Sequence, residues 1–185
     1  MATAKYSRYE YNATTSISRA NVTDMHRAQE AFINYWNGKV SSAATTTFLG
    51  GLATAALEKV FNKSAYTAIP SLLVSALTSA NEWEKNEVLR VAEEGYDQIT
   101  KLLRIFIDNK TFVSIEFSVN YLAFKNLATG NTDFTIIQGN IIPKKLLHPV
   151  VVLFLCKKAP FIGCFSLFQR ICQTPVYFVF HNFCD

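Results

Sequence analysis

The sequence predicts an α+β fold in which a helical N-terminal body is followed by a small antiparallel β-sheet. Apolar residues recur at three- and four-residue steps through most of the first half of the chain, which is the period of helices. The period changes to strict alternation in residues 112–121, and a turn sequence at Thr129–Asn131 precedes a further strand pattern. Runs of helices followed by runs of strands are typical of α+β proteins. We therefore expect a single α+β domain over residues 1–140 and a separate, atypical apolar tail over residues 141–185.

The composition indicates an ordered protein with an unusually apolar face or a membrane contact. Hydrophobic residues make up 50% of the 185 residues and charged residues 17%, against about 25% charged in ordinary soluble domains. A disordered chain has the opposite balance and is excluded. The net charge is +4, but the basic excess lies after Asp133, where the next acidic residue is Asp185. The body therefore carries no basic face, and we expect no nucleic-acid partner.

The N-terminal part is predicted to hold an extended segment and then one helix. Residues 1–22 are rich in Ser, Thr, Tyr and Asn, and they are interpreted as an extended arm, an edge strand or a partly ordered terminus. The first helix is expected over residues 24–37, with Thr23 as its N-cap and Gly38 just beyond its end. Its buried stripe is formed by apolar residues at helical spacing: Met25, Ala28, Phe32, Tyr35 and Trp36.

Two neighbouring stretches without charged residues are predicted to fold back on each other as a helical hairpin. The second helix is expected over residues 42–62 and the third over residues 71–80. No charged residue occurs in Val40–Leu57, and none occurs in Ala65–Asn81. The first stretch is rich in small residues, which let another helix approach closely. Within it, Gly50–Gly51 costs roughly 1 kcal/mol of helix stability per glycine relative to alanine.

A fourth helix and the sheet complete the predicted body. Ser79 and Glu82 have the spacing of a capping box, so a long helix is expected over residues 81–108. Acidic residues crowd its first half and basic residues lie near its end, which complements the helix dipole. The strand pattern that begins at residue 112 continues to Lys125, and Asp133–Gln138 is expected to return as its partner.

Residues 141–185 differ sharply in composition from the body. They contain all four cysteines, four of the five prolines and seven phenylalanines. Three interpretations are open: buried strands such as Val150–Phe154 and Val176–Phe180, a membrane-facing appendage, or a tail translated from a shifted reading frame and not natively structured. No apolar run in the tail reaches the roughly 20 residues that a membrane-spanning helix requires.

No motif in the chain carries recognisable catalytic or cofactor chemistry. A phosphate-binding loop, a dinucleotide fingerprint and a nucleophile elbow are all missing, and the cysteines lack the C-x-x-C spacing of zinc sites. The cysteines are interpreted as two disulfides, as metal ligands together with His148 and His181, or as plain thiols. The acidic cluster from Glu82 to Asp97 lacks the spacing of a calcium loop. We predict no catalytic, cofactor-binding or metal-ligating residue and no enzymatic activity; a pocket that joined His26 or His148 to carboxylates would contradict this.

The uncharged hairpin is the feature that supports a functional hypothesis. It is either the buried centre of a helix bundle or a surface that meets a bilayer or a protein partner, and its Ala- and Gly-rich texture resembles the small-residue helices of bacteriocins. We expect a non-enzymatic, membrane-active or partner-binding protein, with a secreted bacteriocin-like or toxin-like role as the sharpest version. The predicted membrane or partner contacts are the leucines of the hairpin: Leu49, Leu52, Leu57, Leu72, Leu73 and Leu77.

The alternative hypothesis is a soluble structural or protein-interaction module, whose sheet edge or helix face holds another chain. It predicts a bound protein partner or a concentration-dependent homo-oligomer. The N-terminus shows no apolar segment typical of a signal peptide, although the small residues Ala2–Ala4 are typical of a cleavage site. A secreted or membrane-associated location is expected over a cytoplasmic one.

Overall fold

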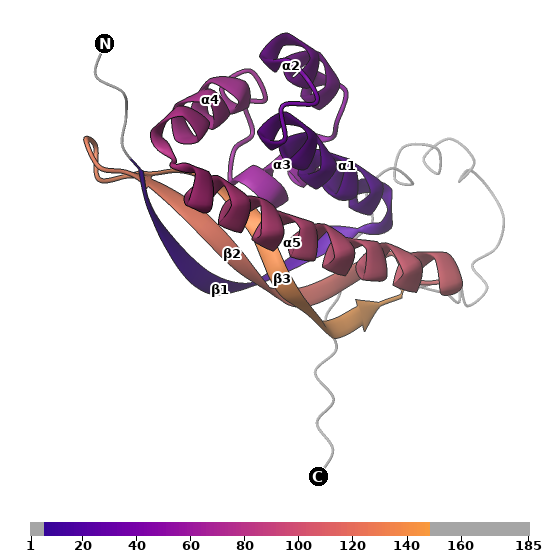
Figure 1. The fold of residues 1–185 in the computed structure, drawn as a ribbon. Coiled ribbons are helices and arrows are strands. Elements are labelled where there is room, and N and C mark those ends of the chain that lie inside the picture. Colours follow the sequence, from indigo (N-terminus) through magenta and orange to yellow (C-terminus); the bar gives the residue numbers. More distant parts are fainter. Residues whose placement is uncertain (1–5, 149–185) are drawn as a thin grey trace, which may run out of the picture. The chain divides into compact units, whose positions relative to one another are not determined.

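The computed structural model describes residues 6–148, all of which lie within one compact unit, Met1–His148. Within this range the expectation of an α+β fold is confirmed, because five helices and one three-stranded antiparallel sheet are present (Figure 1). The bounds of the elements in chain order are β1 Tyr6–Ser18, α1 Arg19–Trp36, α2 Ser42–Gly50, α3 Thr54–Phe61, α4 Ile69–Ser79, α5 Glu82–Asp108, β2 Ser114–Asn126 and β3 Thr132–Leu147.

The sheet has the order β1-β2-β3, so the first strand of the chain pairs with a strand made more than a hundred residues later. The N-terminal segment is therefore an edge strand, one of the three interpretations that the sequence allowed. Its register with β2 runs without a shift from Tyr6 opposite Asn126 to Ser18 opposite Ser114. The β2–β3 pairing contains register shifts, and its turn includes Gly130 at a φ of +73°, a conformation that suits glycine.

The central strand β2 is buried on both of its faces in its second half. Four consecutive residues, Tyr121 to Phe124, are buried, although successive residues of a strand point to opposite faces. Leu122 lines a hollow with Val88 and Val91 of α5. On the opposite face, Thr135 of β3 donates a hydrogen bond to the Val60 carbonyl of α3 at 2.9 Å. Helices therefore cover both faces here, which explains why the alternating pattern of the first half of β2 gives way to a continuous apolar run.

Helix α1 begins earlier than expected. Ser18 has the extended backbone of an N-cap, and Thr23, the expected N-cap, lies inside the helix. The expected end is confirmed, because Gly38 follows the helix at a φ of +69°. Arg19, the first residue of α1, donates hydrogen bonds to the carbonyls of Phe106 (2.6 Å), Phe112 (2.9 Å) and Asn109. The guanidinium thus satisfies carbonyls at the C-terminal end of α5, whose last turn holds no basic residue of its own.

The single helix expected over residues 42–62 is wrong, because the chain forms two helices there. α2 ends at Gly50, and Ala53 has an extended backbone before α3 starts. The two glycines weaken the helix at this point, and Asp24 of α1 accepts a hydrogen bond from the Ala53 amide at 2.9 Å. This remote carboxylate bonds the amide of the N-cap residue, which is the role that a Glu at the third helical position has in a capping box. As a result, α3 turns toward α1 and β3, while α2 packs against α4.

The long helix α5 begins where the sequence predicted, but its cap differs. Asn81 accepts a hydrogen bond from the Glu84 amide and Glu84 accepts one from the Asn81 amide, both at 2.9 Å, which is a complete capping box. The expected pair, Ser79 and Glu82, does not form it; Ser79 bonds the Ala76 carbonyl at the end of α4. A capping box requires an N-cap with an extended backbone, and Asn81 has that conformation.

Helix α5 closes the outer edge of β3 through one glycine and one glutamine. A Cβ at Gly95 would lie 2.0 Å from the Ile137 carbonyl oxygen, so only glycine lets the helix approach so closely. Fully buried Gln29 of α1 donates to the carbonyls of Ile137 (2.8 Å) and Ala92 (3.0 Å), and its Oε1 accepts from the Ile137 amide at 3.4 Å. The Gln29 amide therefore takes the place of a neighbouring strand at this edge.

Strand β3 continues to Leu147 and so passes the composition change at residue 141. Exposed Ile142 and Leu146 lie in this last part of the strand. The expectations for residues 149–185, including the disulfides, the added strands and the shifted frame, lie outside the described residues.

Candidate functional site

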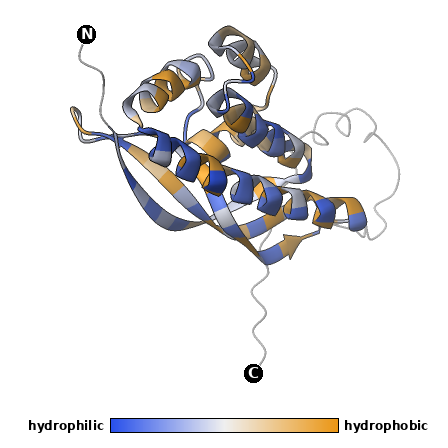
Figure 2. Ribbon diagram, in the orientation of Figure 1, coloured by the Kyte–Doolittle hydropathy of each residue, from blue (hydrophilic) through white to orange (hydrophobic). Residues whose placement is uncertain are grey.

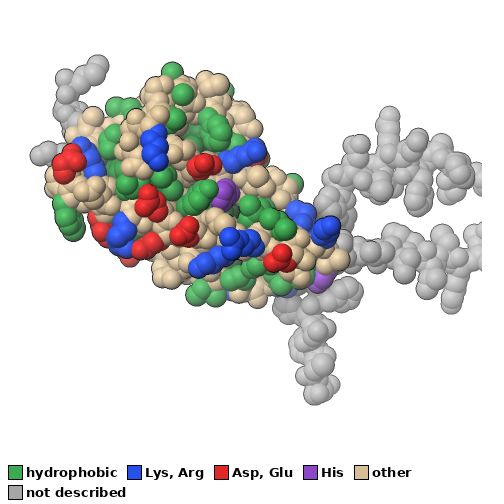
Figure 3. All heavy atoms as spheres, turned by 45° about the vertical axis from the view of Figure 1, so that its right-hand side comes forward, with side chains coloured by type: hydrophobic (Ala, Val, Ile, Leu, Met, Phe, Trp, Pro, Cys, Tyr) green, Lys and Arg blue, Asp and Glu red, His purple; other side chains and the backbone are tan. Residues whose placement is uncertain are grey.

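The candidate site is a surface of α2, α4 and the chain next to them, residues 40–53 and 65–81, which we call the cap. The cap contains no charged residue. In Figure 2 its helices are drawn mainly in white and orange, whereas much of α5 is blue. In Figure 3, red and blue side chains gather along α5, while hydrophobic and other uncharged side chains dominate the upper part of the molecule. The cap is therefore an uncharged surface beside a highly charged helix.

Helix α2 is the most exposed part of the cap. Only Thr45 and Leu49 are buried in this helix, and Phe48 is 45% exposed. Val40, just before the helix, is 37% exposed. Exposing large apolar side chains to water is unfavourable, and another molecule that covered them would remove this unfavourable contact with water.

The threonines of α2 make the surface less polar than their sequence indicates. The Oγ1 atoms of Thr45, Thr46 and Thr47 donate hydrogen bonds to the carbonyls four residues earlier, at 3.0, 2.9 and 3.1 Å. Each hydroxyl hydrogen is thus used within the helix. The outward surface of the helix keeps the threonine methyl groups and few free donors.

A hollow of about 320 Å³ lies where α1 and α2 meet. Most of the surface inside it is apolar, and two polar side chains of α1, Glu30 and Asn34, contribute to its wall. The remaining residues that line it are Ala31, Val40, Ala44, Thr45 and Phe48. A volume of this size holds one or two apolar side chains of another molecule.

The small residues of the cap do allow a close approach, though at Gly50 the neighbour is an aromatic ring rather than a helix. A Cβ at Gly50 would lie 3.0 Å from Cε2 of Tyr66. Tyr66 thus covers the end of α2 and remains 40% exposed. Val74 of α4 is also exposed, at 38%, so apolar side chains extend over both cap helices.

The leucines predicted as contacts divide into two groups. Leu49, Leu57 and Leu73 are at most 1% exposed and belong to the core. Leu52, Leu72 and Leu77 are partly buried and pack against that core. The structure therefore directs the predicted stripe mainly inward, and it exposes Phe48, Val40, Tyr66 and Val74, which the sequence reasoning did not select. The sequence could have indicated that Phe48 is exposed. Phe48 directly precedes Leu49, and adjacent residues of a helix point in different directions, so both cannot lie on the same buried face.

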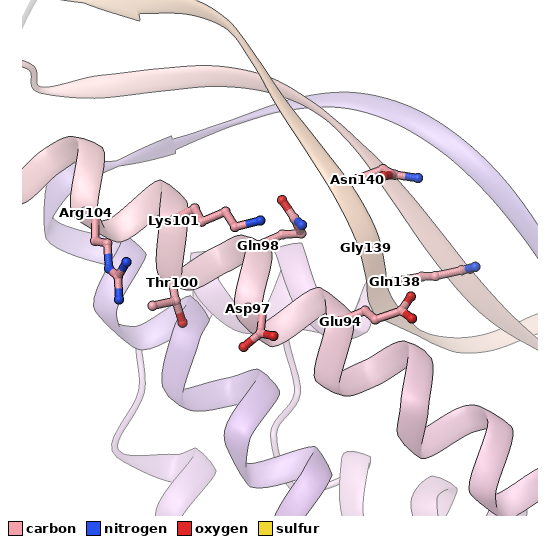
Figure 4. A pocket seen from close by; sticks show the side chains of 9 residues that line it. All are labelled: Glu94, Asp97, Gln98, Thr100, Lys101, Arg104, Gln138, Gly139 and Asn140. Atoms are coloured by element: carbon pink, nitrogen blue, oxygen red, sulfur yellow. The ribbon is translucent and has the colours of Figure 1, made fainter.

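A polar cleft of about 490 Å³ lies between α5 and β3. The residues that line it are Glu94, Asp97, Gln98, Thr100, Lys101, Arg104, Gln138, Gly139 and Asn140. Their side chains point in different directions (Figure 4): Glu94 extends toward β3, whereas Asp97 and Arg104 point away from it. Acid–base chemistry requires groups that converge on one reacting atom, and these side chains diverge.

His26 of α1 lies next to the cleft wall without lining it. The Thr100 hydroxyl donates to the Tyr96 carbonyl at 2.9 Å, so its oxygen accepts from His26 Nε2 at 3.0 Å. The imidazole also packs against the Tyr96 ring, with centroids 4.2 Å apart. Burial lowers the pKa of His26, while the nearby Glu30 carboxylate acts in the opposite direction. Because Nε2 is engaged as a donor, it is not a free base in this arrangement.

Three of the six acidic residues between Glu82 and Asp97 pair with basic residues of the same helix. Arg90 bonds both Glu87 and Glu94, and Lys85 pairs with Glu82. The hydrogen bond from Arg90 holds the pKa of Glu87 below its ordinary value. Among residues 6–148, no group of three or more His, Cys, Asp or Glu side chains is arranged to hold a metal ion. In the same part of the chain, no helix has the length and apolar character needed to cross a membrane.

Comparison with protein-family models, with curated proteins and with solved structures finds no match to this chain.

Proposed function

We propose that the protein is a non-enzymatic protein-interaction module that binds a partner protein through the cap. The observation that carries this proposal is the hollow between α1 and α2, with Phe48 and Val40 exposed at an uncharged surface. An apolar side chain of the partner would enter the hollow, and the rest of the cap would pack around it. Interfaces of this kind have an apolar centre that excludes water.

The low cost of removing water from the cap supports this proposal. Burying an ionised group without a partner costs several kcal/mol or more. The cap itself has none, and the single ionisable side chain at the hollow, Glu30, belongs to the wall formed by α1. Hydroxyl groups without hydrogen-bond partners would also oppose binding, but the threonines of α2 bond their own helix. The methyl groups and small side chains that remain are suited to close packing against another protein surface.

A protein partner fits the cap better than a bilayer does. Helices that lie in a membrane surface have one strongly apolar face and basic residues on the other. The apolar residues of α2 do not form such a face, because its one leucine is buried and its exposed residues are mostly Ala, Ser and Thr. The membrane-active, bacteriocin-like version stays a prediction of the sequence, and the experiment below includes an arm for it.

The test is to select, from a displayed library, helical peptides that bind the full-length protein. Their affinities are then measured for the unchanged protein, for the variant Phe48→Lys and for the variant Trp83→Ser. We expect Phe48→Lys to weaken binding at least about tenfold, because it places a charge at the mouth of the hollow. The control is Trp83→Ser, which removes a 73% exposed aromatic residue of α5 outside the cap and should leave the affinity unchanged.

Peptides that bind the Phe48→Lys variant as tightly as the unchanged protein would contradict the proposed site. Dye release from vesicles of phosphatidylcholine and phosphatidylglycerol, measured on the same proteins, is the membrane arm. Release that depends on Phe48 would favour the membrane version over the protein partner.

A further inference from the structure

Within residues 6–148, no strand pairs with the outer edge of β1. Of the strands that the structure describes, β1 pairs with β2 alone, and Figure 1 shows it as the outermost strand of the sheet. Of the helices, α1 contacts it most, at the junction where the strand ends and α1 begins. An open edge presents a row of backbone donors and acceptors to any extended chain.

The hydrogen bonds elsewhere in the sheet identify which residues of β1 direct their backbone amide and carbonyl away from β2. Ile137 directs its amide and carbonyl toward Gln29, away from β2. Its partner Tyr121 must therefore direct its own groups toward β1, where it lies opposite Tyr11. The Arg19 amide donates to the Val113 carbonyl at 2.9 Å. Arg19 follows Tyr11 by eight residues, an even number, so this bond agrees with Tyr11 bonding β2. Odd-numbered residues of β1 thus bond β2, and even-numbered residues from Tyr6 to Ser16 direct their backbone groups outward.

The strand lacks the features that normally protect an open edge. Edge strands are commonly short, bulged, or interrupted by proline or lysine. β1 has 13 residues, no register shift against β2 and neither proline nor lysine in its sequence, YSRYEYNATTSIS. Its two charged residues are already engaged: Arg8 pairs with Glu84, and Glu10 accepts a hydrogen bond from Gln138 at 2.9 Å.

We propose that a second copy of this chain occupies the edge, with the two β1 strands antiparallel about a twofold axis at Asn12 and the two sheets joined into one of six strands. The charges of the strand favour this arrangement. The pairing places Arg8 opposite Ser16 of the second copy and Glu10 opposite Thr14, so no like charges meet. A parallel arrangement in register would instead bring each arginine beside its equivalent, which is unfavourable.

The cross-strand neighbours on the odd-numbered face also favour the antiparallel pairing about Asn12. Tyr11 would lie opposite Ala13 of the second copy, and Tyr9 would lie opposite Thr15. Tyr9 is 44% exposed in the single chain, and an aromatic residue beside a β-branched one is a stabilising cross-strand pair. The backbone contribution comes from the outward amides and carbonyls of both strands, which are symmetric about Asn12.

The first test is sedimentation velocity of the full-length protein from about 1 to about 100 µM, where we expect a reversible dimer. Ser16→Pro removes an outward amide without removing a bond to β2, and it should weaken the dimer by about a hundredfold, because the twofold axis doubles the loss. The matched control Ser16→Ala keeps the amide and should dimerise as the unchanged protein does. A monomer over the whole concentration range, or a folded Ser16→Pro variant that still dimerises fully, would overturn the proposal.

The second test examines the axis and does not rely on a proline. Asn12→Lys and Asn12→Asp each place like charges opposite each other, so each variant alone should be weakened at least about tenfold. An equimolar mixture of the two should recover the dimer as a mixed species. If both variants dimerise normally, or if their mixture stays monomeric, β1 does not pair with itself about Asn12.

Discussion

The two edge strands of the sheet differ in what covers their outer backbone groups. At β3, α5 approaches within the space that only Gly95 allows, and the buried amide of Gln29 bonds both backbone groups of Ile137. At β1, the even-numbered residues direct their amides and carbonyls outward. Within residues 6–148, the sheet thus has one edge closed by a helix and one edge that no other strand covers, and our proposal places a second copy of the chain at the latter.

The comparison teaches that closure by a helix has strict geometric requirements. A helix has no free backbone groups along its side, so it cannot bond a strand edge directly. It needs a residue without a Cβ to come close, and a side chain from a third element to bond the strand. At the β3 edge these roles fall to Gly95 of α5 and Gln29 of α1. Each can be removed separately.

The largest expected effect comes from Gly95→Ala. In an ordinary helix this change would stabilise by roughly 1 kcal/mol, but here the new methyl group would meet the Ile137 carbonyl at 2.0 Å. We expect the free energy of unfolding to fall by about 3 kcal/mol, since the helix must move off the strand.

The matched control is Gly139→Ala on β3, where the nearest heavy atom to the new Cβ is Glu94 Cβ at 3.6 Å, an ordinary contact. Urea denaturation of both variants provides the measurement. Equal stabilities of the two alanine variants would show that α5 does not lie against β3 as described.

A smaller loss is expected for Gln29→Leu, which keeps the apolar volume but removes the amide. The Ile137 amide and carbonyl would be left buried without these partners, which costs about 2 kcal/mol. Gln98→Leu is the control, because Gln98 lies half-buried at the polar cleft and should change stability little. Amide hydrogen exchange at Ile137 gives a direct readout: it should accelerate in Gln29→Leu alone, and unchanged protection would contradict the role of Gln29.

The smallest expected effect is a decrease in the free energy of unfolding in mild acid, caused by His26. His26 lies one turn before Gln29, and burial lowers its pKa below the ordinary 6.5. A lowered pKa means that the neutral form is favoured in the folded protein. The stabilisation that neutral His26 provides is therefore complete above pH 6.5 and is lost as the pH falls through the pKa of His26 in the folded protein.

Denaturation curves of the unchanged protein and His26→Gln, recorded between about pH 7 and about pH 5, measure this contribution. The decline in stability should be shallower in the variant, because glutamine does not titrate in this range. Parallel declines would assign the acid sensitivity to other groups.

The features that could be predicted from the sequence are those with a regular local pattern. The alternation in β2, the long stripe of α5 and the glycine after α1 each follow from the geometry of one element. The break between α2 and α3 could not be predicted in this way, because it depends on Asp24, which lies 29 residues from Ala53. Local glycines weaken a helix, but a distant carboxylate determines where the next one begins.

The candidate site was less predictable than the fold. The uncharged stretches were apparent, but their leucines were predicted as membrane or partner contacts, and three of them are in the core. The orientation of α2 is set by packing on α1 and α4, which no periodicity within nine residues determines. Gln29 offers the opposite case, because it lies four residues after Met25 on the buried stripe. A polar residue on a buried stripe indicates that its side chain is hydrogen-bonded in the core, but the sequence does not identify the partner.

The order of the strands has a consequence for synthesis of the chain on the ribosome. β1 precedes the helices in the chain, yet β2, its partner strand among the described residues, ends at Asn126. All five helices are complete before that partner exists. Among the described elements, β1 therefore has no partner strand while the helices form. The sheet is assembled last, from strands that lie before and after the helices in the chain. The nascent protein thus has a period in which β1 has no neighbouring strand, and a chaperone that binds extended segments would find it then.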